Sequence, residues 1–170
     1  RWSLEGKNVV VTGGTKGIGA ACVEELCAMG ACVLTCSRNA TELAQCAEAW
    51  RGQGYQVHTV AADLSTTEGR QALLQATEQT FGSVHCLVNN VGRNIRKRAI
   101  EYAEEEYSLI TETNLKSAYA LTIAMHPLLC RGAAEGGASV VNVGSVAGGC
   151  GTAMRSGVVY AMGKAALTQV

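Results

Sequence analysis

Tyr160 and Lys164 stand four residues apart near the end of the 170-residue sequence. On a helix, side chains at this spacing lie on one face, so the lysine ammonium can sit close to the tyrosine phenol. A neighbouring positive charge lowers the pKa of a phenol from about 10 toward neutral pH. The pair could therefore give a proton to a carbonyl oxygen and take it back. Chance produces Tyr-x-x-x-Lys often, so this interpretation depends on the residues that precede the pair.

A glycine-rich turn follows an apolar run, Asn8–Thr12, and precedes a helix predicted over Ile18–Met29. Glycines permit a tight turn and let backbone N–H groups approach a pyrophosphate at the positive end of the helix. The spacing G-x-x-x-G-x-G differs from the G-x-G-x-x-G of other dinucleotide folds. A chance glycine triplet is the alternative, but the place between strand and helix favours phosphate binding. The candidate cofactor-binding residues of the turn are Gly13, Thr15, Lys16, Gly17, Ile18 and Gly19.

The second predicted strand, Cys32–Cys36, ends where a carboxylate would bind the ribose 2′-hydroxyl of NAD. Ser37 and Arg38 stand there instead. An arginine suits a 2′-phosphate through charge-assisted hydrogen bonds, and Lys16 adds a second positive charge nearby. These residues favour NADP over NAD; the alternative is that both cations are merely solvated.

Strand-like and helix-like segments alternate along the whole chain. Strict alternation predicts right-handed crossovers and a parallel sheet covered on both faces. We therefore predict one α/β domain over residues 1–170, a Rossmann-type doubly wound parallel sheet. The further strands are expected at Val57–Ala62, Val84–Val88 and Ser139–Val143, and the further helices at Ala40–Arg51, Thr66–Phe81, Glu104–Leu129 (with Pro127 near its end) and from about Tyr160.

The composition excludes several classes of partner. Fourteen basic and fourteen acidic side chains cancel, so no basic field exists to attract nucleic acid or an anionic membrane. No run of about 18 apolar residues is present, so no membrane-spanning helix is expected. Eight cysteines without a C-x-x-C spacing and three isolated histidines indicate a reduced, cytoplasmic protein with no metal site, rather than a disulfide framework. The sequence begins without methionine, so a targeting segment could precede it.

Taken together, these motifs resemble the short-chain dehydrogenase/reductase family from Leu4 to Val170. The ordered set that carries the resemblance is Thr12–Gly19, Asn89-Asn90-Val91-Gly92, Ser145 and Tyr160-x-x-x-Lys164. Within the family the sequence is most similar to the tropinone reductase-like group. That closer similarity lies in Arg1-Trp2-Ser3-Leu4, Thr35-Cys36-Ser37-Arg38-Asn39 and Tyr107-Ser108-Leu109-Ile110.

The resemblance implies a catalytic set of Asn114, Ser145, Tyr160 and Lys164. Tyr160 would be the general acid and base, and Ser145 would polarise the substrate carbonyl. Asn114 would hold a water in a proton relay, and Lys164, beside Tyr160, would also bind the nicotinamide ribose. Two hydroxyl donors would then converge where negative charge develops on the carbonyl oxygen.

The resemblance also implies the remaining contacts of an NADP(H) cofactor. Asp63 and the adjacent Leu64 would lie by the adenine ring, and Asn90 and Gly92 would lie along the cofactor. The protein would then position the cofactor, whose nicotinamide carries the hydride chemistry.

The implied activity is an NADP-dependent oxidoreductase that transfers a hydride between nicotinamide and a small ketone or secondary alcohol. One alternative is a 3-oxoacyl-carrier-protein reductase, for which the basic segment Arg93–Arg98 could contact an acidic carrier, although a solvated loop also explains that segment. Another is a non-catalytic nucleotide-binding or interaction protein. Relatives pair subunits through the long helix and the tyrosine-bearing helix, so a homodimer or homotetramer is expected.

The sequence departs from the family pattern at three places. Gly144 stands where relatives often have another serine, and the segment from Ser145 to Tyr160 is longer than usual. We also expect Val170 to lie within the last helix, whereas relatives continue with two strands and a substrate-covering segment. The fold is therefore expected to be C-terminally incomplete, with exposed apolar faces on the fifth strand and last helix.

Overall fold

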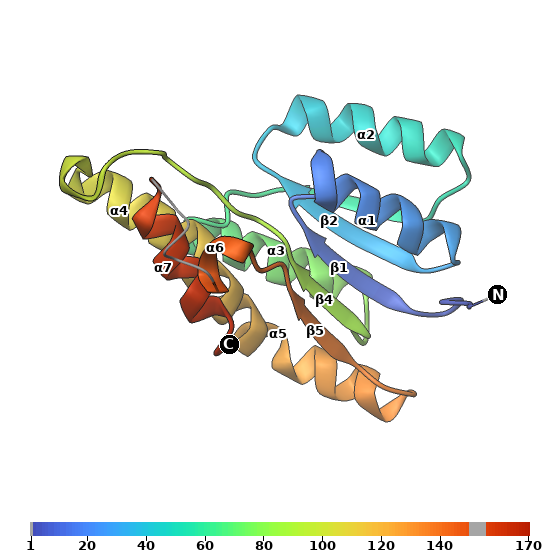
Figure 1. Cartoon of the computed structure of the whole chain (residues 1–170). Helices are drawn as coiled ribbons and strands as arrows, with labels where there is room; N and C mark the ends of the chain where they lie inside the picture. Colours follow the sequence, from blue (N-terminus) through green and yellow to red (C-terminus); the bar gives the residue numbers. More distant parts are fainter. Residues whose placement is uncertain (1, 150–155) are drawn as a thin grey trace.

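The computed structural model describes residues 2–149 and 156–170, which form one parallel five-stranded sheet (Figure 1). The strand order is β3-β2-β1-β4-β5, so the chain winds outward from β1 in both directions. This is the predicted doubly wound arrangement. The strands are β1 (Asn8–Thr12), β2 (Cys32–Ser37), β3 (Val57–Ala61), β4 (Cys86–Asn89) and β5 (Ser139–Asn142).

Helices cover both faces of the sheet (Figure 1). On one face lie α1 (Gly17–Ala28) and α2 (Ala40–Gly52); on the other lie α3 (Thr67–Thr80) and α5 (Ser117–Ala134). The remaining helical segments are η1 (Ala99–Glu101), α4 (Glu104–Thr111), η2 (Glu112–Lys116), α6 (Val146–Gly149) and α7 (Val158–Leu167).

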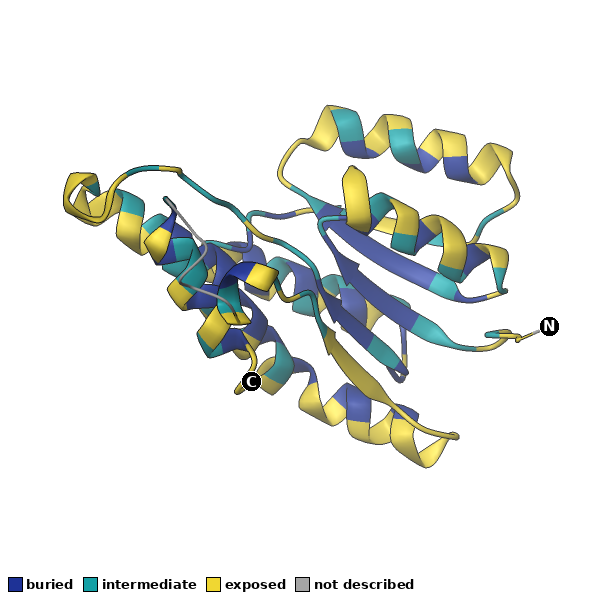
Figure 2. Cartoon of the chain, viewed as in Figure 1, coloured by how far each residue is buried: buried dark blue, intermediate teal, exposed yellow. Residues whose placement is uncertain are grey.

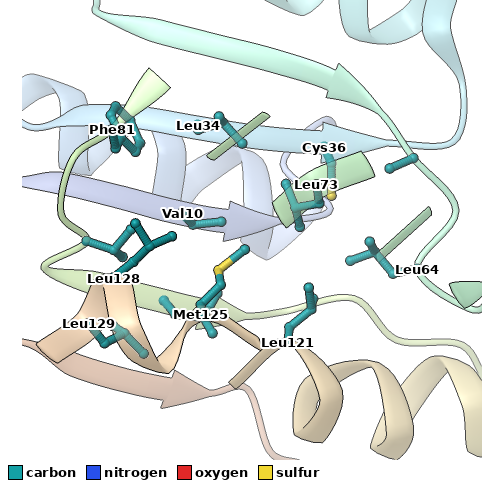
Figure 3. Close-up of a cluster of buried hydrophobic side chains, with 13 residues drawn as sticks. Val10, Leu34, Cys36, Leu64, Leu73, Phe81, Leu121, Met125, Leu128 and Leu129 are labelled. Atoms are coloured by element: carbon teal, nitrogen blue, oxygen red, sulfur yellow. The ribbon is translucent and has the colours of Figure 1, made fainter. Parts of the chain in front are cut away.

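Each face of the sheet has its own hydrophobic core because side chains alternate along a strand. In β1, Val9 and Val11 pack with Trp50 under α1 and α2. Val10 points to the opposite core, where it joins Met125 of α5 (Figure 3). All three valines are at most 2% exposed, so β1 is the buried centre of the domain.

The predicted helix Glu104–Leu129 is wrong in two respects. Its middle is a π-helical turn, η2, and Pro127 lies inside α5, which continues to Ala134. Proline in a helix interior removes one hydrogen bond and costs about 3 kcal/mol. The helix continues because Leu128 and Leu129 are buried against the sheet, while Ile123, whose carbonyl loses its partner, lies at an exposed position.

The C-terminal region also differs from the expectation. A short helix, α6, replaces part of the predicted loop, and α7 ends at Leu167, so Val170 lies beyond the helix. The expected apolar exposure is present: β5 is largely exposed (Figure 2). Val140 and Val141 on β5, and Val158 and Met162 on α7, are exposed hydrophobic side chains.

Candidate functional site

The carboxyl ends of β1, β2, β3 and β4 border a cavity of about 440 Å³, which we call the main cleft. Its position is the switch point of the sheet, where the chain turns from β1 to one side and later to the other. Open parallel sheets bind ligands at this place. The main cleft is lined by Gly13, Lys16, Ile18, Cys36, Ser37, Arg38, Ala62, Asp63, Leu64, Asn90, Val91, Gly92, Arg93 and Thr113.

The main cleft thus gathers nine of the predicted cofactor-binding residues from four separate segments. Thr15 lines an adjacent hollow instead, and Gly17 and Gly19 shape the turn between β1 and α1. A side chain on Gly19 would begin 2.1 Å from the carbonyl oxygen of Gly13. Only glycine therefore permits this close approach, which keeps the turn tight against the start of α1.

Thr12 fixes the segment after β4 to the end of β1. Its hydroxyl Oγ1 accepts hydrogen bonds from the backbone N–H groups of Asn90 (2.8 Å) and Val91 (3.1 Å). The same hydroxyl donates to the carbonyl of Val88 at 3.2 Å. The Asn90 amide in turn donates to the carbonyls of Thr12 (2.8 Å) and Gly13 (3.2 Å). Two sides of the main cleft are therefore joined by one buried threonine and one asparagine.

Asp63 lies in the main cleft with positive charges across from it. Burial raises the pKa of its carboxyl group, but two hydrogen bonds from Ser65 and the charges of Arg38 and Arg93 outweigh burial. The Asp63 oxygen Oδ1 accepts from the Ser65 hydroxyl at 2.7 Å and from the Ser65 backbone N–H at 3.0 Å. The net result is a pKa below the ordinary value, so Asp63 is an anion at neutral pH.

A second hollow of about 430 Å³ adjoins the main cleft at the beginning of α2. We call it the polar recess; it is lined by Thr15, Lys16, Ser37, Arg38, Asn39 and Glu42. The Thr15 hydroxyl donates to the Ser37 hydroxyl at 3.3 Å. Lys16, predicted as a candidate cofactor cation, forms an ion pair with Glu42 (Nζ to Oε2, 2.6 Å). The predicted cations thus share a polar site, but one of them already has an anionic partner.

Tyr160 and Lys164 lie on α7 with the predicted geometry. The Lys164 Nζ atom is 5.9 Å from the centroid of the Tyr160 ring. Lys164 is only 3% exposed, and its ammonium donates to the carbonyl of Val143 at 2.6 Å. Burial lowers the pKa of the lysine below its ordinary value of 10.5. A buried cation therefore lies beside a half-buried phenol.

Asn114 connects the π-helical turn η2 to the end of the main cleft. Its amide Nδ2 donates to the carbonyls of Arg93 and Ile110, both at 2.7 Å, and its Oδ1 accepts from the Arg93 N–H at 3.1 Å. Single π-helical turns inside α-helices are frequently found at functional sites. A side chain on Gly92 would begin 3.0 Å from Asn114 Oδ1 and 3.7 Å from Lys164 Nζ. These three residues therefore meet at one end of the cleft.

Ser145 directly precedes α6. Its Oγ accepts from the N–H of Ala147 at 3.2 Å, and α6 packs directly on α7. A side chain on Gly148 would begin 2.7 Å from the carbonyl carbon of Lys164. This glycine lets α6, which directly follows Ser145, approach α7 closely.

The basic segment Arg93–Arg98 is partly neutralised. Lys97 forms an ion pair with Glu106, and Arg98 forms one with Glu101. Glu101 lies on η1 and Glu106 on α4, both shortly after the basic segment, so these cations have local partners. The geometry favours the solvated-loop interpretation of this segment over a carrier-protein site.

The family model for short chain dehydrogenases matches residues 7–170. The chain belongs to the short-chain dehydrogenase family. A tropinone reductase homolog of Arabidopsis thaliana is 46% identical over 171 residues, with 100% of this chain and 63% of that relative aligned. This confirms the resemblance within the family. The chain spans less than two thirds of the length of that relative.

Solved short-chain dehydrogenase structures agree with the fold. The complex of RhlG from Pseudomonas aeruginosa with NADP has a TM-score of 0.90 at 34% identity, over 98% of this chain and 65% of that one. L-Sorbose reductase from Gluconobacter frateurii, complexed with NADPH and L-sorbose, has a TM-score of 0.89 at 28% identity, over 98% and 62% of the two chains.

The sequence did not single out Glu42 or Gly148 as site residues, and it gave Thr12 and Arg93 only as parts of the motif Thr12–Gly19 and the basic segment Arg93–Arg98. The sequence shows that Thr12 ends an apolar strand and that Gly148 follows Ser145. It does not show that Thr12 contacts Asn90 or that Gly148 contacts Lys164. Among residues 2–149 and 156–170, no group of three or more His, Cys, Asp or Glu could hold a metal ion. Within the same part of the chain, no helix combines the length and apolar character needed to cross a membrane.

Proposed function

We propose that this short-chain dehydrogenase is an NADP-dependent oxidoreductase that interconverts a small ketone and its secondary alcohol. The observation that carries the proposal is Lys164, a buried lysine whose ammonium lies beside the Tyr160 ring and near Gly92 at the end of the main cleft. Burying a charge is costly even when it is hydrogen-bonded, as Lys164 is to the Val143 carbonyl. A buried lysine beside a phenol and a cleft is therefore a candidate for a role in proton transfer.

The residues that line the main cleft support binding of a dinucleotide. The glycine turn offers backbone N–H groups at the beginning of α1, and Asp63 and Leu64 border the cavity at the end of β3. When bound, a nicotinamide cofactor supplies the hydride. Asn90 and Gly92 would lie along it, with Lys164 at its ribose.

In this proposal the side chains of this protein transfer the proton. Tyr160 donates its phenolic proton to the substrate carbonyl oxygen, and Ser145 donates a second hydrogen bond to the same atom. The ammonium of Lys164 lies 5.9 Å from the centroid of the ring that gives up this proton. Asn114 would contribute to a proton relay, while its side chain fixes Arg93 next to Gly92.

Tyr160→Phe tests the proton transfer. We expect NADPH oxidation by the full-length protein, followed with a panel of small ketones, to fall by about 10²–10⁴ in kcat, which is the usual contribution of a general acid. Tyr55→Phe, which removes the same atom away from α7, should leave kcat unchanged. A full-length protein that binds NADPH but reduces none of the ketones would instead favour the non-catalytic nucleotide-binding alternative.

Arg38 and Lys16 support NADP over NAD because both cations border the polar recess next to the main cleft. Arg38→Asp should reduce affinity for NADPH and improve affinity for NADH, measured by fluorescence titration of the nicotinamide. Arg51→Asp, at the other end of α2, makes the same charge change outside the polar recess and should not alter the preference. A persistent NADPH preference in Arg38→Asp would contradict the assignment.

We also infer a homodimer or homotetramer for the full-length protein. The exposed side chains of Tyr119 and Ile123 on α5, and of Val158 and Met162 on α7, support this because exposed apolar groups favour self-association. Light scattering of the purified protein measures it directly.

A further inference from the structure

The polar recess is built like an anion site but contains an acid of its own. It combines two cations, Lys16 and Arg38, with the hydroxyls of Thr15 and Ser37. It also lies at the beginning of α2, where the aligned peptide dipoles favour negative charge. Among the described residues that line it, Glu42 is the one carboxylate.

Glu42 occupies the position that an incoming anion would use. It is the third residue of α2, and its backbone N–H is already taken by the side chain of the N-cap residue, Asn39, at 3.1 Å. Its Oε2 lies 2.6 Å from Lys16 Nζ, and its side chain is 21% exposed against 79% for the lysine. The hydrogen bond from Lys16 lowers the pKa of Glu42, so the carboxylate is charged at neutral pH.

We infer that Glu42 competes with the 2′-phosphate of NADP for Lys16 and so limits how strongly this chain prefers NADP over NAD. This inference rests on the proposed function, which puts that phosphate in the polar recess. A phosphate monoester carries a charge of about −1.5 to −2 at neutral pH. It must draw the ammonium of Lys16 away from Glu42 and then lie near a second anion.

The charges in the polar recess determine whether neutralising Glu42 strengthens or weakens binding of the 2′-phosphate. Lys16 and Arg38 together offer two positive charges, and Glu42 cancels one of them. The 2′-hydroxyl of NAD is neutral and meets no such conflict. Neutralising Glu42 should therefore strengthen binding of the 2′-phosphate and leave binding of the 2′-hydroxyl form unchanged.

Glu42→Gln tests the inference on the full-length protein, in which residues 15–42 form the polar recess. Isothermal titration with 2′,5′-ADP and with 5′-AMP compares the same adenosine with and without the 2′-phosphate. We expect Glu42→Gln to bind 2′,5′-ADP roughly fivefold more tightly, the size of one repulsive charge at a partly exposed site. Affinity for 5′-AMP should stay within about twofold. Glu48→Gln makes the same change at an exposed position of α2 and should alter neither affinity.

A second variant separates competition from simple long-range repulsion. Lys16→Met should weaken binding of 2′,5′-ADP, and adding Glu42→Gln to it should then bring a smaller gain than in the wild type. If Glu42→Gln binds 2′,5′-ADP equally or less tightly, Glu42 holds Lys16 in place for the phosphate and the inference is overturned. If the wild type binds 2′,5′-ADP no more tightly than 5′-AMP, the NADP assignment itself fails, whatever Glu42→Gln does.

Discussion

Thr12→Val is the sharpest test of how the segment after β4 is fixed to the end of β1 at the main cleft. Thr12 is 1% exposed, and valine has nearly the same shape, so the substitution leaves no cavity. It removes the hydroxyl that accepts from the N–H groups of Asn90 and Val91 and donates to the carbonyl of Val88. The change therefore isolates three hydrogen bonds between segments 76 to 79 residues apart.

The expected loss of stability follows from the number of hydrogen bonds that Thr12→Val removes. A typical intramolecular hydrogen bond contributes about 1 kcal/mol net, and a donor left without a partner can cost about 1–3 kcal/mol. The three bonds of Thr12 predict a loss of about 3 kcal/mol in the free energy of unfolding. Small domains have about 5–15 kcal/mol in total, so the loss is large. Thr12→Ser keeps the hydroxyl and removes one buried methyl group, which costs about 1 kcal/mol.

Urea unfolding of the chain, followed by circular dichroism, measures both variants. The slope of the free energy with urea should not change, because the same surface is exposed on unfolding. Affinity for 2′,5′-ADP should fall in Thr12→Val, since Asn90 and Val91 line the main cleft. Two results would refute the reasoning: Thr12→Val within about 0.5 kcal/mol of the wild type, or Thr12→Ser as destabilised as Thr12→Val.

Two further predictions concern the glycine turn and a buried histidine. Gly19→Ala should abolish 2′,5′-ADP binding in the same titration, because its Cβ would lie 2.1 Å from the Gly13 carbonyl oxygen, whereas Gly52→Ala, with open space around it, should bind normally. The pKa of His85 is lowered by burial and by Lys7, against an opposing effect of Glu135, so the unfolded chain binds its proton more readily. Stability should therefore fall as pH drops below the ordinary value of 6.5 and be insensitive to this group above it; in urea unfolding, His85→Gln should lose that dependence.

Much of the fold could be predicted because it depends on local patterns. The alternation of apolar runs and helical segments predicted all five strands to within two residues at either end. The long helix was predicted less well. Pro127 is a local signal for termination, but burial of Leu128 and Leu129 against the sheet outweighs it. Packing of this kind depends on residues far away in the sequence and cannot be read from the helix itself.

The candidate site divides in the same way. Spacing placed Tyr160 and Lys164 on one face of a helix, and the residue types at the end of β2 indicated a phosphate site. The burial of Lys164, its bond to the Val143 carbonyl and the partner of Lys16 were not predictable from spacing. Each of these three features depends on the position in the fold of a second segment of the chain.

The sequence by itself determined the order of the elements, the glycine turn and the four-residue spacing of Tyr160 and Lys164, because backbone geometry fixes what lies three or four residues apart. Only the tertiary structure decided that Asn114 binds the backbone of Arg93, that Thr12 joins β1 to the segment after β4, and that Glu42 reaches Lys16. Asn114 and Arg93 are 21 residues apart, and Thr12 and Asn90 are 78 residues apart. Lys16 precedes α1, whereas Glu42 lies on α2. The geometry of these contacts exists only once the sheet has brought its carboxyl ends together.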